Sequence, residues 1–156
     1  MSSERILFCD QVPYAEHLAR YSLADLALDT SPFGGGATTS DVLYAGLPII
    51  TTMGNTFAGR MSASLLDAIG LPELITNSLE EYEDLAFQLA IEPGKLSLLK
   101  ERLARNRSTY PLFDTTLFTR HIENAYTKIW DRHRSGLPPD HIYVERYIRK
   151  AGHDSV

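Results

Sequence analysis

The sequence predicts an α/β fold, a Rossmann-like parallel sheet with flanking helices. Short apolar, β-branched runs alternate with helical patterns at intervals of roughly 20 residues through the first half of the chain, which is typical of βαβ units. The second half is almost entirely helical in pattern. Three consecutive glycines, Gly34–Gly36, follow a predicted strand, at the sheet edge where parallel sheets commonly bind ligands.

Four short strands are predicted, each bounded by polar or turn residues. They are RILFC (5–9), LADLALDT (23–30), LPIITT (47–52) and ELIT (73–76). A free-standing doubly wound domain usually has about five or six strands, so we expect the chain to be the back end of a larger unit. We expect a partial Rossmann-like lobe over residues 1–137, α/β over 1–76 and helical over 77–137, and then a tail, 138–156.

Helix boundaries are predicted from turn and capping residues. Pro13 opens the first helix, and a helix beginning at Asp41 ends before Gly46. Asn77 or Ser78 is expected to cap a helix with an acidic first turn. The other helical segments are SASLLDAIG (62–70), LEEYEDLAFQLA (79–90), KLSLLKERLARNR (95–107) and TLFTRHIENAYTKIWDRHR (116–134).

Composition narrows the class of protein. Apolar residues make up 44% of the 156 residues, and 15 basic against 20 acidic groups give a net charge of −5, which disfavours nucleic-acid binding. Cys9 is the single cysteine, so an intramolecular disulfide is impossible and a reducing compartment is expected. No apolar run approaches the roughly 20 residues of a membrane span, and no signal peptide is evident. We expect a cytoplasmic protein.

The glycine loop is a candidate anion site. It leads from a strand end to a helix N-terminus near Thr39, where free N–H groups and the helix dipole attract negative charge. Glycines permit close backbone approach and positive φ, and Thr38 and Ser40 add hydroxyl donors. This combination suits a diphosphate held without metal. A flexible capped loop explains the same composition, and the loop matches neither a P-loop nor the dinucleotide fingerprint.

Asp41 is expected in the first turn of the following helix, where two roles are open. It could complement the helix dipole, or its carboxylate could accept hydrogen bonds from a ribose diol. No other residues form a catalytic or metal constellation: zinc spacing and the G-x-S-x-G elbow are absent. We therefore predict no catalytic residue, metal or cofactor. Trp130 is expected to pack in a core or against another lobe.

Taken together, these motifs resemble the C-terminal catalytic lobe of the protein O-linked N-acetylglucosamine transferases, glycosyltransferase family 41, of the bacterial type with TPR repeats. The stretch LADLALDTSPFGGGATTSDVLYAGLPIITTMGNTFAGRMSASLL has the family's order of motifs. The resemblance continues through LPELI, EYEDLA and PLFDTTLFTRHIENAYTKIWDRHRSGLPPDHI. It implies the second half of the C-terminal lobe of a GT-B glycosyltransferase.

The resemblance also implies a UDP-sugar site. The loop and helix start would hold the diphosphate, and Asp41 would bind the ribose hydroxyls. The segment QVPYAEHLARYS is similar to the family's uracil-side segment, so Val12 would contact the base through its backbone, with Arg20 beside the base and His17 near the nucleotide. The implied nucleotide-binding residues are Val12, His17, Arg20, Gly35, Gly36, Ala37, Thr38, Thr39 and Asp41.

Some positions depart from the family pattern. Tyr14 stands where the family has a lysine, so it can stack on a base but carries no charge. When the sequences are aligned on Asp41, Gly36, Ala37 and Thr38 stand at the positions of the family's His-Thr-Thr run. The first threonine of that run is therefore missing here, and Thr39 would take its place by a shift of one residue. The family's phosphate-binding lysine and acceptor-side histidines have no counterpart in this sequence.

The resemblance implies inverting transfer of N-acetylglucosamine or a related sugar from a UDP-sugar to protein serine or threonine. Without the N-terminal lobe or TPR region as partner, the chain is expected to be inactive. One alternative is a non-catalytic scaffold that self-associates as a homo-oligomer through an exposed interlobe face. Another is a receiver-like α/β domain, for which Asp10 and Asp29 exist but the required lysine does not.

Overall fold

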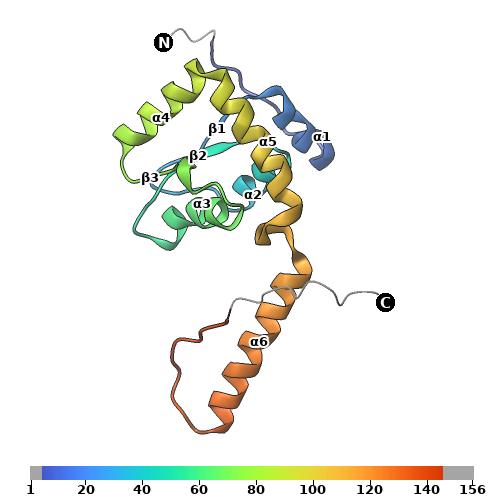
Figure 1. The fold of residues 1–156 in the computed structure, drawn as a ribbon, viewed down its shortest axis with the longest axis vertical. Helices are drawn as coiled ribbons and strands as arrows, with labels where there is room; N and C mark the ends of the chain where they lie inside the picture. The colour runs from blue at the N-terminus through green and yellow to red at the C-terminus, as the bar shows by residue number, and fades with distance from the viewer. Residues whose placement is uncertain (1–4, 146–156) are drawn as a thin grey trace. The chain divides into compact units, whose positions relative to one another are not determined.

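The computed structural model describes residues 5–145, which form two compact units, Met1–Tyr110 and Pro111–Val156 (Figure 1). The division falls inside residues 1–137, which the sequence assigned to one lobe. The first unit contains the sheet and the predicted site, and the second is built on one long helix. Each unit is described by itself.

The sheet of the first unit is parallel, and its strands lie in the order β1-β2-β3. Their bounds are Ala27–Leu28 for β1, Ile49–Thr52 for β2 and Ile75–Thr76 for β3. Ala27 lies opposite Ile49, and Thr51 lies opposite Ile75. The central strand is the most buried, as expected for the middle of a parallel sheet. The predicted α/β class and parallel sheet are confirmed.

The predicted strand at residues 5–9 is not present. These residues have no strand structure, and the side chains of Ile6, Leu7 and Phe8 are 51%, 86% and 94% exposed. An apolar run suits a strand, but a strand also needs a neighbouring strand to take its hydrogen bonds. Within residues 5–145, β1 pairs with β2 and with no segment on its other side. The described sheet therefore has three strands, where four were predicted.

Five α-helices belong to the first unit. They are α1 (Tyr14–Arg20), α2 (Ala37–Tyr44), α3 (Phe57–Ala68), α4 (Leu79–Ile91) and α5 (Pro93–Thr109). Figure 1 shows the sheet between α4 above and α2 and α3 below. The core between these layers consists of fully buried aliphatic side chains, among them Leu43, Ile50, Leu66, Leu74 and Leu103. This layered burial fixes the carboxyl ends of the strands, where the glycine loop lies.

Two predicted helix boundaries are confirmed by their hydrogen bonds. The Ser78 hydroxyl accepts from the Glu81 N–H at 3.1 Å, and the Glu81 carboxylate accepts from the Asn77 N–H at 2.7 Å, a reciprocal cap for α4. Gly46 follows α2 with a φ of 88°, a conformation that favours glycine. At these two helix ends, local sequence signals are sufficient to predict the boundary.

The second unit is built on α6 (Thr115–Arg134), whose N-terminus is capped by Asp114. No residue of α6 is buried, and Trp130 is 59% exposed, so the described residues do not give it the packing that was predicted. Residues after the helix return along it: Arg132 Nε donates to the Pro138 carbonyl at 2.6 Å and Lys128 Nζ to the Tyr143 carbonyl at 2.7 Å. Residues 146–156 of the predicted tail lie outside the described residues.

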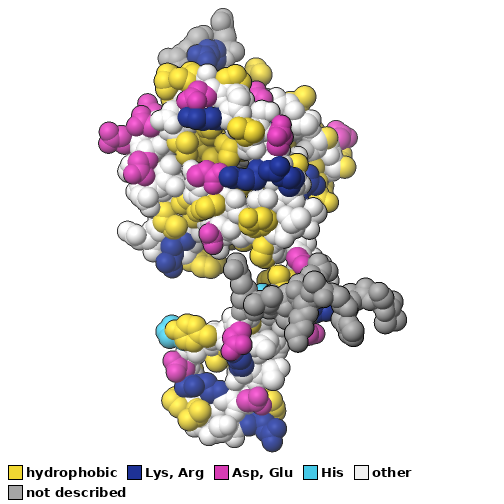
Figure 2. Space-filling model, viewed as in Figure 1, with side chains coloured by type: hydrophobic (Ala, Val, Ile, Leu, Met, Phe, Trp, Pro, Cys, Tyr) yellow, Lys and Arg dark blue, Asp and Glu magenta, His cyan; other side chains and the backbone are white. Residues whose placement is uncertain are grey.

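The surface is mixed in character. On the face shown in Figure 2, acidic and basic side chains are interspersed with apolar ones. In the part of the chain that the structure describes, no helix has both the length and the apolar character needed to cross a bilayer.

Candidate functional site

The N-terminus of α2 follows directly from the glycine loop, at the carboxyl end of β1. The helix begins at Ala37 with Gly36 as its N-cap and no capping side chain. Its first backbone hydrogen bond runs from the Ser40 N–H to the Gly36 carbonyl at 3.0 Å. The N–H groups of Ala37, Thr38 and Thr39 therefore have no acceptor within the helix, and they lie at the positive end of its dipole.

The helix therefore begins at Ala37, earlier than either predicted start, near Thr39 or at Asp41. No side chain caps the helix, because Gly36 occupies the N-cap position. The consequence is that Asp41 is the fifth residue of α2, beyond the first turn. The dipole-complement role that was open for Asp41 does not apply, since that effect is confined to the first turn.

Asp29 fixes the glycine loop to the sheet. One carboxylate oxygen, Oδ1, accepts from the Gly35 N–H at 2.8 Å, and Oδ2 accepts from the Thr51 hydroxyl at 2.7 Å. The Asp29 carbonyl accepts from the Tyr82 hydroxyl at 2.8 Å. Sequence reasoning considered Asp29 only for a receiver-like domain. The signal that could have found it was an acidic residue at a strand end just before a glycine run.

A second set of hydrogen bonds fixes the loop to α3. The Ser62 hydroxyl donates to the Gly35 carbonyl at 2.7 Å and lies 2.9 Å from the Thr39 hydroxyl. Thr39 and Ser62 are buried. Both backbone groups of Gly35 are thus bonded inside the protein, and the Thr39 hydroxyl faces inward. Gly35 therefore has no N–H left for a ligand, and Thr39 is fully buried, so neither of these two predicted ligand contacts is open at the surface.

The glycines of the loop are required by close packing. None of Gly34, Gly35 and Gly36 has a positive φ, so the predicted conformational reason is wrong. A Cβ on Gly35 would lie 2.5 Å from Thr39 Oγ1, and one on Gly36 would lie 2.5 Å from Met61 Cε. Side chains at these positions would push the loop away from α2 and α3. The first clash is with a buried atom and the second with the end of a flexible side chain.

Asp41 contacts a residue of α1. The Tyr14 hydroxyl donates to Asp41 Oδ1 at 2.7 Å, and this bond is the first cause of a raised Tyr14 pKa. The Tyr21 pKa is also raised, by burial and then by the Asp41 carboxylate, while Arg20 opposes the shift. Asp41 is half-buried, and its carboxylate forms no ion pair with a cation of residues 5–145. Its charge remains available to a ligand.

The remaining predicted residues belong to α1 and the segment before it. His17 Nε2 lies 2.9 Å from the Tyr21 hydroxyl, and the two rings meet edge-on with centroids 5.0 Å apart. Arg20 Nη2 donates to the Asp10 carbonyl at 3.0 Å. Val12 is half-buried. The bond from Tyr14 brings α1 to Asp41, so the two parts of the predicted site are neighbours.

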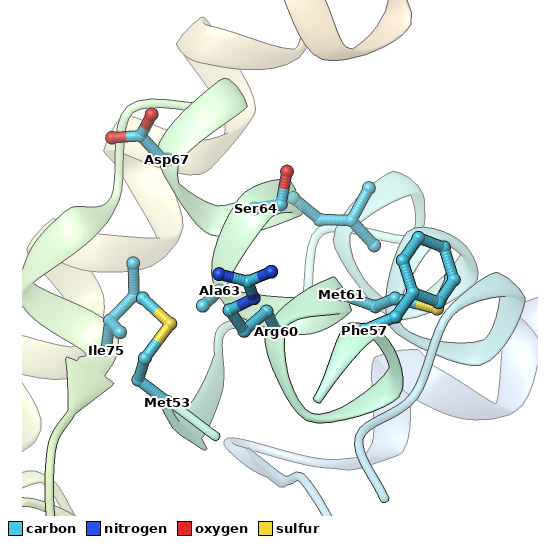
Figure 3. A pocket seen from close by; sticks show the side chains of 9 residues that line it. Met53, Phe57, Arg60, Met61, Ala63, Ser64, Asp67 and Ile75 are labelled. Atoms are coloured by element: carbon cyan, nitrogen blue, oxygen red, sulfur yellow. The ribbon is translucent and has the colours of Figure 1, made fainter. Parts of the chain in front are cut away.

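A hollow of about 610 Å³ lies on α3, and Asp41 is not among its lining residues. Figure 3 shows Met53 and Ile75 at one end, Met61 and Phe57 at the other, and Arg60 between them. None of the predicted nucleotide-binding residues lines it. Met61, whose side-chain end faces Gly36, is one of its lining residues. The candidate site therefore consists of the α2 N-terminus and the Asp41 region.

Within residues 5–145 no group of three or more histidine, cysteine, aspartate or glutamate side chains is arranged to hold a metal ion. The site is instead made of backbone N–H groups, one carboxylate and tyrosine hydroxyls. Such groups bind an anion next to a polyol.

Comparison with known proteins gives consistent matches. Residues 1–122 match the family model described as glycosyl transferase family 41. A probable UDP-N-acetylglucosamine–peptide N-acetylglucosaminyltransferase SEC of Arabidopsis thaliana is 41% identical over 152 residues, 97% of this chain and 16% of the relative. The UDP-N-acetylglucosamine–peptide N-acetylglucosaminyltransferase of Caenorhabditis elegans is 32% identical over 142 residues, 91% of this chain and 12% of the relative.

A solved structure agrees with these matches. The structure of a mutant O-GlcNAc transferase of Thermobaculum terrenum superposes with a TM-score of 0.75 at 37% identity, covering 80% of this chain and 24% of that one. The chain thus spans less than a quarter of the length of each of these proteins.

Proposed function

Since the chain belongs to glycosyltransferase family 41, we propose that it forms the donor-binding part of an inverting protein O-glycosyltransferase. The donor is a UDP-sugar, UDP-N-acetylglucosamine or a close analogue, and the acceptor is a serine or threonine hydroxyl of a protein. The names of the relatives support this choice of donor and of a peptide acceptor. No cofactor is proposed.

The main support for the proposal is the arrangement of backbone N–H groups and the Asp41 carboxylate on α2. Ala37 and Thr38, which are exposed, offer N–H groups at the positive end of the helix, and the Asp41 carboxylate lies further along the same helix. A nucleoside diphosphate needs these two features side by side, an anion site for the phosphates and a paired acceptor for the ribose diol. Gly36 allows the ligand to approach the backbone closely, since it presents no side chain.

The α1 side is proposed to hold the base. Val12 offers backbone groups to the uracil ring, with Arg20 beside it and His17 close to the nucleotide. Hydrogen bonds already restrict both side chains. His17 is bonded to the Tyr21 hydroxyl, and Arg20 donates to the Asp10 carbonyl. Both side chains remain partly exposed and can still contact a ligand.

The chemical task proposed for this site is stabilising the leaving UDP. As the bond from sugar to phosphate breaks, negative charge accumulates on the diphosphate, and oriented N–H groups stabilise it without reorganising. The residues that position and deprotonate the acceptor are proposed to lie in parts that the longer relatives contain. The isolated chain is therefore expected to bind donor without transferring sugar.

Calorimetric titration of the 156-residue chain with UDP tests the proposal. We expect binding, weakened at least about tenfold by Asp41→Ala, because the diol loses its charged acceptor. The matched control is Asp84→Ala, which removes an exposed carboxylate on α4 and leaves affinity unchanged. Circular dichroism confirms folding of each variant. A folded chain that ignores UDP would contradict the proposal.

A second candidate function rests on α6. Its apolar side chains Phe118, Tyr126 and Trp130 are 64%, 66% and 59% exposed, and an exposed apolar helix face favours association. The alternative is thus a scaffold that self-associates through this face. Sedimentation measurements that show concentration-dependent assembly, together with indifference to UDP, would favour it over the donor-binding proposal.

A further inference from the structure

The hydrogen bond between Tyr14 and Asp41 joins two elements that are distant in sequence. The residues are 27 positions apart, on α1 and α2, and the bond is short at 2.7 Å. Within residues 5–145, Tyr14 is the one side chain that donates to Asp41. Helix α1 itself has no buried residue, so this bond contributes to holding α1 beside the site.

We propose that Tyr14 is a positioning residue for Asp41, which it holds in the orientation that receives the ribose diol; this inference rests on the proposed function. An aspartate on a helix surface samples several side-chain rotamers. The bond from Tyr14 to Oδ1 selects one of them before ligand arrives. Pre-ordering of this kind raises affinity, because the ligand no longer has to restrict the side chain.

The carboxylate retains the capacity to bind a diol in this state. Two carboxylate oxygens provide about four acceptor positions, of which Tyr14 uses one on Oδ1. The second oxygen, Oδ2, accepts from no side chain of the described residues. Three hydroxyl groups, one from tyrosine and two from ribose, can therefore share Asp41.

The chemistry of the phenol suits this role. A neutral hydroxyl orients the carboxylate without cancelling its charge, whereas a cation would form an ion pair and compete with the ligand. A phenol is protonated at neutral pH, so the Tyr14 hydroxyl is a donor there, and the hydrogen bond to Asp41 raises the pKa of Tyr14 further in the same direction. Tyr14 is 63% exposed, so removing its hydroxyl is not expected to disturb a core.

A double-mutant cycle on the full chain tests the inference. UDP and 2′-deoxy-UDP are titrated into the unaltered chain, Tyr14→Phe, Asp41→Ala and the double variant. We expect Tyr14→Phe to weaken UDP binding about three- to tenfold, and to have no further effect once Asp41 is alanine. The loss is expected to be smaller with 2′-deoxy-UDP, which has one hydroxyl fewer to align. Tyr126→Phe, an exposed tyrosine on α6, is the control and leaves affinity unchanged.

The outcomes separate the inference from the function on which it rests. Absence of UDP binding by the unaltered chain overturns both. UDP binding that Asp41→Ala weakens but Tyr14→Phe leaves unchanged or strengthens overturns the positioning role alone. The positioning role is also overturned if Tyr14→Phe weakens both nucleotides equally, or weakens them in the Asp41→Ala background, because the phenol would then act independently of the carboxylate.

Discussion

The glycine loop precedes α2, and the Tyr14–Asp41 pair joins α1 to the second turn of α2, yet the two are held in different ways. Gly35 is bonded through both its N–H and its carbonyl, to Asp29 and Ser62, among atoms that are largely buried. Among residues 5–145, Asp41 has one side-chain hydrogen-bond partner, the exposed Tyr14. Changes at the loop are therefore expected to alter folding and binding together. Changes at Tyr14 or Asp41 are expected to alter binding with little effect on stability.

The difference in hydrogen bonding between the loop and Asp41 also indicates which part of the proposed donor site is ordered before the ligand binds. The phosphate side is ready before the ligand arrives, because α3, the sheet and Tyr82 all hold the loop. On the nucleoside side, the described residues provide one side-chain hydrogen bond between α1 and α2. A ligand that joins the two sides would stabilise α1 more than the loop.

The largest effect is expected from Asp29→Ala. The Gly35 N–H and the Thr51 hydroxyl would both lose their acceptor, which we expect to cost about 2–4 kcal/mol of unfolding free energy. Urea denaturation measures it. The control is Asp29→Asn, which keeps one oxygen for Gly35 and should lose less. If Asp29→Ala were as stable as the unaltered chain, the loop would not depend on this carboxylate and the comparison would fail.

An intermediate effect is expected when alanine replaces neighbouring glycines. Gly35→Ala meets the buried Thr39 hydroxyl and should cost about 1–3 kcal/mol, because the surroundings cannot move easily. Gly36→Ala meets the flexible Met61 side chain and should cost less in stability while still obstructing UDP. Thermal melts and UDP titrations of the pair are compared. If Gly35→Ala and Gly36→Ala destabilised the chain equally, burial of the Thr39 hydroxyl would not be what determines the cost.

The smallest effect is expected from Tyr82→Phe, which removes the bond to the Asp29 carbonyl. The cost at neutral pH should be about 0.5–1.5 kcal/mol. Burial, and then the Asp29 carboxylate, raise the Tyr82 pKa above its ordinary 10.0 in the folded chain. The unfolded chain therefore ionises first, and this contribution falls as pH rises from about 10.

Urea denaturation of both chains at pH 8 and near pH 10.5 checks this dependence. The stability difference between the unaltered chain and Tyr82→Phe should narrow at the higher pH. A difference that widens would mean that the folded state favours the phenolate, the opposite of the expected sign.

Local patterns in the sequence were sufficient for several elements. The alternation of strands and helices indicated the parallel sheet, and the Ser78 and Glu81 cap and the glycine after α2 were readable because their partners lie within a few residues. The sequence also predicted that the glycine loop follows the end of a strand. The family resemblance, confirmed by the comparisons, added the nucleotide-binding roles, which stay proposals.

Other features depended on contacts between distant segments. Residues 5–9 have strand composition but no neighbouring strand in the described sheet. Asp29 could not be recognised as the loop's anchor, because its partners Thr51 and Tyr82 lie 22 and 53 positions away. The Tyr14–Asp41 bond likewise joins positions that no local pattern connects.

The sequence by itself determined the class of fold, the helix ends with nearby caps, and a glycine run leading to a helix, since these follow from periodicity and local hydrogen bonding. The tertiary structure alone decided which loop groups face inward, where α2 begins and what holds Asp41. Those outcomes depend on the side chains that the sheet and α3 bring against the loop, and on which donors and acceptors remain unsatisfied once they are packed.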